Sequence, residues 1–237
     1  MSQPEHFLTN VYPSAIIWDL DGTLVESAPD LATALNTLLN EQGQQGHTVV
    51  KVRPMIGGGV AKLIERGFRA SGAPLDQAAV DAMVPRFMEI YTACATDHTD
   101  LVPSAREVLD YFYHAGIKQG LCTNKPIAVT RLILTALDIQ GYFGSVIGGD
   151  STNVKKPHPR PLLTCLEELQ IRPEDAVMIG DSGADVGAAR AAGVPVILVP
   201  DGYTGVPAVS LGADFVVGRL ADIPSSIPPH PPLRQSA

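Results

Sequence analysis

The chain contains few cysteines and few aromatic residues. Among its 237 residues there are three cysteines, one tryptophan and 5% aromatic residues in total. The cysteines, Cys94, Cys122 and Cys165, are widely spaced and form no C-x-x-C pair. Neither a zinc site nor a disulfide framework is therefore indicated. We expect buried free thiols in a reducing cytoplasm.

Long apolar runs and an excess of positive charge are also absent. No apolar run approaches the roughly 20 residues of a membrane span. The first residues lack the basic segment and apolar core of a secretory signal. The net charge of −8 disfavours broad nucleic-acid binding and docking on anionic membranes. We expect neither of those partners, whereas a local cationic pocket for a small anionic substrate remains compatible with an acidic surface.

Short continuous apolar runs, each ended by polar or turn-forming residues, are the main pattern in the sequence. Apolar residues make up 45% of the chain and charged residues 18%, an ordinary globular composition. Apolar residues at helical spacing lie between the runs from about residue 100 onward, and this alternation predicts a parallel α/β sheet. The predicted strands are 14–18, 117–122, 176–179, 194–199 and 215–217.

A long insertion follows the first predicted strand. Only helices are predicted there, at 28–42, about 59–70 and 76–93, and Ser27 with Asp30 resembles a capping box. An insertion of this length indicates a second small domain rather than a loop. We predict an α/β core from 1–26 and 99–223, a helical insertion at 27–98 and an extended proline-rich tail at 224–237.

Four polar motifs lie at the predicted strand ends, the edge where open parallel sheets bind ligands. They are Asp-Leu-Asp-Gly-Thr at 19–23, Cys-Thr-Asn-Lys at 122–125, Lys-Lys-Pro at 155–157 and Gly-Asp-Ser-Gly-Ala-Asp at 180–185. In the first motif, Asp19 and Asp21 are close enough to repel, so a cation must neutralise them. Mg²⁺ prefers such oxygen ligands, and Asp181 and Asp185 can complete its shell.

The same residues suit phosphoryl transfer, which requires a nucleophile, charge neutralisation and a proton donor. Asp19 can attack phosphorus, and Asp21 can protonate the leaving oxygen and then deprotonate water. Thr123 and Asn124 can donate hydrogen bonds to phosphoryl oxygens, and Lys156 can balance the negative charge.

The motifs resemble those of the haloacid dehalogenase-like phosphatase superfamily over nearly the whole chain, and those of its phosphoglycolate phosphatase group in particular. The stretches that carry the closer resemblance are 19–31, 122–126, 148–150, 156–159 and 191–195. The resemblance implies a Rossmann-like α/β core with 27–98 as a helical cap. It also implies Mg²⁺-dependent hydrolysis of a small phosphorylated metabolite, 2-phosphoglycolate, through a phosphoryl-aspartate.

The resemblance implies a role for each motif residue. It implies that Asp19 is the nucleophile, that Asp21 is the acid/base, and that Thr123 and Lys156 bind the phosphate. It implies that the metal ligands are the Asp19 carboxylate, the Asp21 carbonyl and Asp181. Asp185 corresponds to an outer ligand or an orienter of Lys156. Two departures stand out. Trp18 occupies a position where phenylalanine is usual, and residues 101–104 replace a Pro-Gly opening.

Phosphoglycolate carries a carboxylate besides its phosphoryl group, so a second anion site is expected in the cap. Gly57, Gly58 and Gly59 precede a predicted helix, and a glycine-rich turn at a helix N-terminus suits a small anion. We predict that this turn faces the carboxylate and that Arg53 is its side-chain contact.

Several alternatives share these motifs. The chain could be a phosphatase of a sugar phosphate, an aminosugar phosphate or pyrophosphate, a sugar phosphomutase, or a catalytically silent binding module. A dehalogenase is disfavoured because that branch lacks the second acid at Asp21. The motifs are compatible with a monomer or a homodimer.

Overall fold

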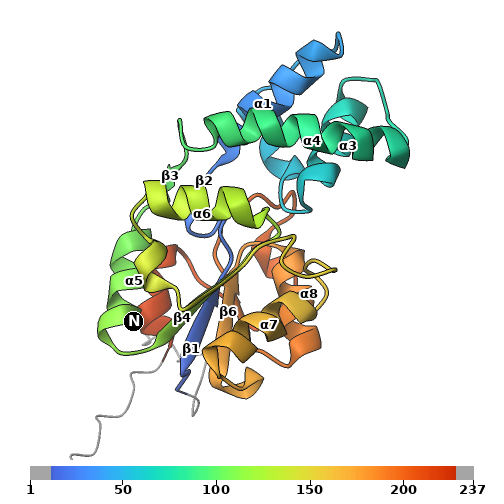
Figure 1. Cartoon of the computed structure of the whole chain (residues 1–237). Coiled ribbons are helices and arrows are strands. Elements are labelled where there is room, and N and C mark those ends of the chain that lie inside the picture. The colour runs from blue at the N-terminus through green and yellow to red at the C-terminus, as the bar shows by residue number, and fades with distance from the viewer. Residues whose placement is uncertain (1–11, 228–237) are drawn as a thin grey trace, which may run out of the picture.

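A six-stranded parallel sheet forms the centre of the computed structural model, which describes residues 12–227 (Figure 1). The strand order is β5–β4–β1–β6–β7–β8, which confirms the predicted parallel α/β class. The strands are β1 (Ala15–Trp18), β4 (Lys118–Cys122), β5 (Ser145–Ile147), β6 (Ala176–Gly180), β7 (Val196–Leu198) and β8 (Phe215–Val216). Strand β5 was not predicted, because a run of three residues beginning with Ser145 gives no periodic signal.

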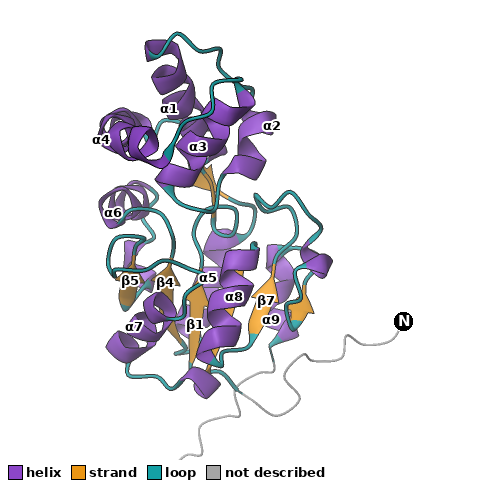
Figure 2. Cartoon of the chain, turned by 90° about the vertical axis from the view of Figure 1, so that its right-hand side faces the viewer, coloured by secondary structure: helices purple, strands orange, loops and turns teal. Residues whose placement is uncertain are grey.

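Helices cover both faces of the sheet (Figure 2). Alternate residues of β1 point to opposite faces: Ile16 and Trp18 enter one apolar cluster, and Ala15 and Ile17 enter the other. This two-sided burial explains why the strand reads as a continuous apolar run. On the first face lie α5 (Ala105–His114) and α9 (Ile223–Ser226), on the second α7 (Arg160–Leu169) and α8 (Gly183–Ala192), while α6 (Ile127–Ala136) lies between the sheet and the upper helices.

The chain between β1 and β4 forms a separate layer of helices above the sheet (Figures 1 and 2). It enters and leaves through a two-stranded antiparallel ribbon of β2 (Val25–Glu26) and β3 (Asp100–Leu101). The helices are α1 (Ala28–Glu41), α2 (Val49–Val52), α3 (Val60–Ala70) and α4 (Gln77–Cys94), with a 3₁₀ turn at Arg53–Met55. The three longer ones occupy the predicted helical segments. We call residues 28–94 the cap. The boundaries at 27 and 98 stay a prediction.

Four further 3₁₀ turns connect elements of the core, and they complete the secondary structure of the described residues. These turns are Gln140–Tyr142, Pro173–Asp175, Ala208–Ser210 and Leu220–Asp222.

The expected capping box at the start of α1 is wrong. Ser27 makes no side-chain capping bond, and its hydroxyl donates to Asp21 instead. The buried Asp30 carboxylate accepts hydrogen bonds from the backbone of His98 and from both the backbone and the hydroxyl of Thr99. Both side chains therefore bind tertiary partners and do not cap the helix. Asp30 ties the segment that enters the cap to the segment that leaves it.

The proline-rich tail begins differently from its prediction. Residues Ile223–Ser226 form the short helix α9, and Ile223 and Ile227 are buried against the core. The predicted extended segment up to residue 237 lies outside the described residues from 228 onward.

All three cysteines are free thiols; Cys122 and Cys165 are buried and Cys94 is half-buried. In the described part of the chain, no helix has both the length and the apolar character needed to cross a membrane.

Trp18 fills a buried position where it also makes a polar contact. Its indole N–H donates to Gln119 Oε1 at 3.0 Å, and Gln119 donates in turn to the Leu109 carbonyl at 2.9 Å. The indole packs against Phe112, with ring centroids 6.0 Å apart. Both Trp18 and Gln119 are buried, so a tryptophan in place of phenylalanine is matched by a polar partner on β4.

We expect Trp18→Phe to lower the free energy of unfolding by about 1–3 kcal/mol, because the Gln119 carbonyl oxygen loses its buried donor. Adding Gln119→Leu should restore part of this loss, since both polar partners are then gone. Urea unfolding of the two single variants and the double variant measures the coupling, with Tyr113→Phe at an exposed site as control. Strictly additive losses would contradict the coupling.

Candidate active site

The first motif residue, Asp19, continues the hydrogen-bond ladder of β1. Its backbone N–H donates to the Ile179 carbonyl of β6 at 2.8 Å, and the residue is buried. The chain then turns at Gly22, whose φ is +82°. A Cβ at Gly22 would lie only 2.6 Å from Asp181 Oδ2. Glycine is thus required both for the turn and for the close approach of Asp181 to it.

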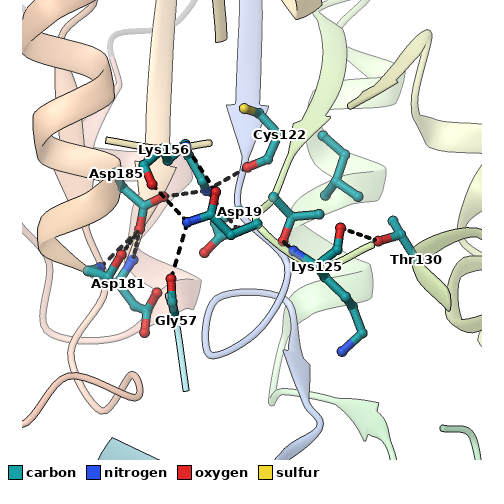
Figure 3. Close-up of polar contacts among 12 residues, drawn as sticks. Asp19, Gly57, Cys122, Lys125, Thr130, Lys156, Asp181 and Asp185 are labelled. Carbon is teal, nitrogen blue, oxygen red and sulfur yellow. Dashed lines mark hydrogen bonds and ion pairs between the residues drawn. The ribbon is translucent and has the colours of Figure 1, made fainter. Parts of the chain in front are cut away.

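Lys156 is the buried cation at the carboxyl end of the sheet (Figure 3). Its Nζ lies 2.6 Å from Asp185 Oδ1, 2.6 Å from the Cys122 carbonyl oxygen and 2.9 Å from Asp19 Oδ1. Burial lowers the pKa of Lys156, but the Asp185 and Asp19 carboxylates outweigh burial and raise it above its ordinary value. Lys156 is therefore an ammonium, and its three contacts connect the ends of β1 and β4 to α8.

Asp185 lies in the first turn of α8, where the positive end of the helix dipole favours a carboxylate. Its Oδ2 accepts hydrogen bonds from the Asp181 N–H, the Ser182 N–H and the Ser182 hydroxyl. Its Oδ1 binds Lys156. Because both oxygens have partners, Asp185 is placed to orient Lys156 rather than to bind a metal directly.

Three carboxylates at this end of the sheet have ligand oxygens within 4.8 Å of one another: Asp19, Asp181 and Asp185. The Lys156 ammonium balances one of them, so two negative charges remain. Asp19 Oδ1 is buried and accepts no hydrogen bond from the described residues, although Lys156 forms an ion pair with it. Two uncompensated charges and a buried oxygen without a hydrogen bond suit a hard divalent cation between Asp19 and Asp181.

The protonation of the cluster reflects its burial first and its excess charge second. Burial raises the pKa of Asp19 to about 6, and the Lys156 ammonium opposes part of the rise. Burial also raises the pKa of Asp181 well above its ordinary value, and the Asp185 and Asp19 charges add to the rise. In the absence of a further cation, the cluster therefore takes up protons more readily than exposed carboxylates do.

Asp21, the second acid of the first motif, faces the cap. Its Oδ1 accepts a hydrogen bond from the Ser27 hydroxyl and lies 2.8 Å from Lys125 Nζ. Only 2% of the Lys125 side chain is exposed, and its ammonium stacks over the Tyr91 ring at 4.9 Å from the centroid. No role was predicted for Lys125, although it belongs to the motif at 122–125. Its position next to Asn124 was the only signal in the sequence.

A small cavity lies between the sheet edge and the cap. The space in it that is open to the centre of a water molecule is about 40 Å³. The core lines it with Asp19, Asp21, Thr123, Asn124, Lys125, Pro126, Lys156, Ser182 and Ala184, and the cap with Leu31, Ile56, Gly57, Gly59, Val60, Leu63 and Tyr91.

The two predicted donors after β4 are placed differently. Thr123 is buried and lines the cavity. The Asn124 amide donates to the carbonyls of Lys156 and Gly57, and its Oδ1 accepts from the Lys156 N–H. Both amide hydrogens of Asn124 are thus in use, and its placement does not support the predicted side-chain bond to a phosphoryl group. Asn124 instead connects Lys156 to the cap.

The predicted glycine turn lies partly in the cavity. Gly57 and Gly59 line it, whereas Gly58 lines a neighbouring hollow. Arg53 lines neither: its guanidinium lies 2.9 Å from Glu26 Oε2 and donates to the Asp201 carbonyl at 3.1 Å. This placement does not support Arg53 as a substrate contact. Its charge is paired with Glu26 of the β2–β3 ribbon.

Tyr203 is a further residue that the sequence did not single out. Its backbone N–H donates to Asp181 Oδ2 at 2.7 Å. Its hydroxyl accepts hydrogen bonds from the N–H groups of Ser27 and Ala28, and lies 2.9 Å from Glu26 Oε1. Tyr203 therefore links a candidate metal ligand to the first turn of the cap. It lies in a loop without a recognisable motif, so no sequence signal identified it.

The chain is similar to known proteins over most of its length. Residues 16–199 match the family model described as haloacid dehalogenase-like hydrolase. Phosphoglycolate phosphatase of Caulobacter vibrioides is 41% identical over 213 residues, which cover 90% of each chain. That of Rhodospirillum rubrum is 38% identical over 215 residues, 89% of each chain. The crystal structure of a predicted phosphoglycolate phosphatase from Haemophilus somnus has a TM-score of 0.82 and 29% identity, and covers 90% of this chain and 96% of that one.

The carboxylate cluster makes cation binding and stability depend on pH. Because the pKa of Asp19 is raised from 3.8 to about 6 on folding, the folded protein holds a proton that the unfolded chain has lost, and stability falls as pH rises through this window. A divalent cation at this cluster would bind the ionised form and compete with that proton.

We therefore expect Mg²⁺ to raise Tm more at pH 8 than at pH 5. At pH 8, with Mg²⁺ at a hundred times its Kd, binding contributes about 2.7 kcal/mol, which corresponds to a shift of about 5–10 °C. Differential scanning fluorimetry measures this shift. Asp181→Asn should abolish it, and the exposed Asp81→Asn should leave it unchanged. A shift of equal size at the two pH values would contradict competition with the proton.

Proposed function

The chain belongs to the haloacid dehalogenase-like hydrolases and is a phosphatase, and from this premise we propose that it hydrolyses 2-phosphoglycolate to glycolate and phosphate through a phosphoryl-aspartate at Asp19. The observation that carries the proposal is the buried Asp19 carboxylate, which lies 2.9 Å from Lys156 in a small cavity that Asp21 also lines. The identity of 41% to a named phosphoglycolate phosphatase supports the choice of substrate.

In this proposal Asp19 attacks phosphorus in line with the leaving oxygen. The Lys156 ammonium, held by Asp185, neutralises charge on the transferring group without moving, because it is already oriented by three oxygen partners. The Thr123 hydroxyl, which lines the same cavity, donates to a phosphoryl oxygen.

Asp21 is the acid and then the base in this proposal. Its carboxyl group lines the cavity beside Asp19 and is oriented by the Ser27 hydroxyl. In the first step Asp21 gives a proton to the leaving alkoxide of glycolate. In the second step it takes a proton from the water that attacks the phosphoryl-aspartate, and the products are phosphate and free Asp19.

Mg²⁺ is the cation that we propose for the carboxylate cluster. The Asp19 carboxylate, the Asp21 backbone carbonyl and Asp181 would hold it, with Asp185 in the surrounding layer. When bound, it neutralises charge on the phosphoryl oxygens and keeps Asp19 ionised.

A substrate panel tests the assignment. We expect the kcat/KM for 2-phosphoglycolate to exceed the kcat/KM for hexose phosphates, aminosugar phosphates, nucleoside monophosphates and pyrophosphate. Asp19→Asn should lower turnover at least about a thousandfold, because the amide cannot attack phosphorus. The exposed Asp97→Asn serves as the matched control. A better substrate elsewhere in the panel would replace phosphoglycolate, and formation of hexose 6-phosphate from the 1-phosphate would identify a phosphomutase.

The two steps assigned to Asp21 predict a dependence on the leaving group. Asp21→Asn should lower kcat/KM for ethyl phosphate by about 10²–10⁴-fold. The loss for p-nitrophenyl phosphate should be smaller, because nitrophenolate leaves without a proton. With p-nitrophenyl phosphate a rapid burst of nitrophenol should precede slow turnover, since hydrolysis of the phosphoryl-aspartate loses its base. Identical slowing of both substrates without a burst would count against the acid role of Asp21.

A further inference from the structure

Two buried lysines line the cavity, and the proposed chemistry uses only one of them. Lys156 is bound to Asp19 and Asp185. Lys125 approaches from the loop after β4, and only 2% of its side chain is exposed. Figure 3 shows the Lys125 side chain running away from the Asp19–Lys156 group, towards the side from which Gly57 enters the site. The cavity therefore has a second cationic end, next to the cap.

We propose that Lys125 binds the carboxylate of the substrate and thereby sets the preference for small phosphate esters that carry a second negative charge. This inference rests on the proposed function, because it places the phosphoryl group at Asp19 and the leaving oxygen at Asp21. Lys125 Nζ lies 2.8 Å from Asp21 Oδ1, so it is close to the leaving oxygen. In phosphoglycolate a single methylene separates that oxygen from the carboxylate, which therefore falls within reach of Lys125.

The surroundings of Lys125 suit an anion. An ammonium has three donors; one is directed at Asp21, and the cation lies over the face of Tyr91. A donor is thus left for a ligand, while the Tyr91 ring and the Asp21 carboxylate hold the ammonium in place. The neighbouring cap residues Leu31, Ile56, Val60 and Leu63 are apolar. An ion pair in such a lining is weakly screened, so it contributes more than it would in water.

The cap cations near the glycine turn have partners elsewhere. Arg53 is paired with Glu26, and Lys62 with Glu65. Arg66 donates to the carbonyl of Met55 at 2.8 Å and so supports the segment that leads to Gly57. Among the cavity-lining residues in the described part of the chain, Lys125 is the one cation not engaged by the Asp19 cluster.

Three substrates separate binding of the carboxylate from other roles of Lys125. Lys125→Met should lower kcat/KM for 2-phosphoglycolate by about 10–100-fold, the usual effect of losing a charge-assisted hydrogen bond. Ethyl phosphate has the same two carbons but lacks the carboxylate, so its kcat/KM should change less than about threefold. p-Nitrophenyl phosphate also lacks the carboxylate and needs no proton donor, so its kcat/KM should change equally little. The exposed Lys51→Met in α2, which does not line the cavity, is the matched control and should leave all three rates unchanged.

Other patterns would overturn the proposal. Equal losses with 2-phosphoglycolate and ethyl phosphate, with p-nitrophenyl phosphate spared, would show that Lys125 positions Asp21 only. Losses with all three substrates would point to a folding defect in the variant, and a second measurement on the unaltered protein then tests the proposal. The unaltered protein should hydrolyse the methyl ester of the 2-phosphoglycolate carboxylate at least about tenfold more slowly than the free acid. An equally fast ester would refute recognition of the carboxylate.

The test distinguishes failure of this inference from failure of the proposed substrate. If another anion-bearing ester exceeds phosphoglycolate on the unaltered protein, and Lys125→Met removes that preference, the role of Lys125 stands while phosphoglycolate is replaced. If the unaltered protein prefers no anion-bearing ester over its neutral counterpart, the inference about Lys125 is overturned.

Discussion

The ion pairs of Lys156 with Asp19 and Asp185 hold the carboxyl end of the sheet together. A buried ammonium is costly unless it is fully paired, and here three oxygens from three elements surround it: Asp19 after β1, the Cys122 carbonyl of β4 and Asp185 of α8. Because Asp185 also binds the backbone of Asp181 and Ser182, the same contacts position the loop after β6. One lysine thus positions the proposed nucleophile, its neighbouring strand and a candidate metal ligand.

That arrangement leaves more negative charge than a single lysine can neutralise. The remaining charge on Asp19 and Asp181 suits the proposed divalent cation. Burial raises the pKa of both acids, and neighbouring carboxylates add to the rise. The cap completes the site from the other side. Asn124 bonds to Gly57, and Tyr203 joins the Asp181 loop to the start of α1. These contacts join the core to the cap on either side of the cavity.

Much of the fold was predictable because the apolar patterns in the sequence coincide with the buried strands and helices of the structure. The apolar runs at 14–18 and 176–179 became β1 and β6, and the helical spacing within 27–98 became α1, α3 and α4. Failures occurred where long-range contacts outweighed local preference. Ser27 and Asp30 have the spacing of a capping box, but Asp21 and Thr99 bind them instead. Strand β5 is too short for a periodic signal, and pairing with β4 alone defines it.

The sequence by itself determined which residues stand at the strand ends, because a motif such as Asp-Leu-Asp-Gly-Thr carries its turn and its carboxylates together. Only the tertiary structure decided which side chains remain available to a ligand. Asn124 is used by Lys156 and Gly57, Arg53 is used by Glu26, and Lys125 enters the cavity beside Asp21. The physical reason is that a polar side chain binds whichever partner lies nearest in space, and spacing along the chain does not specify partners from another domain.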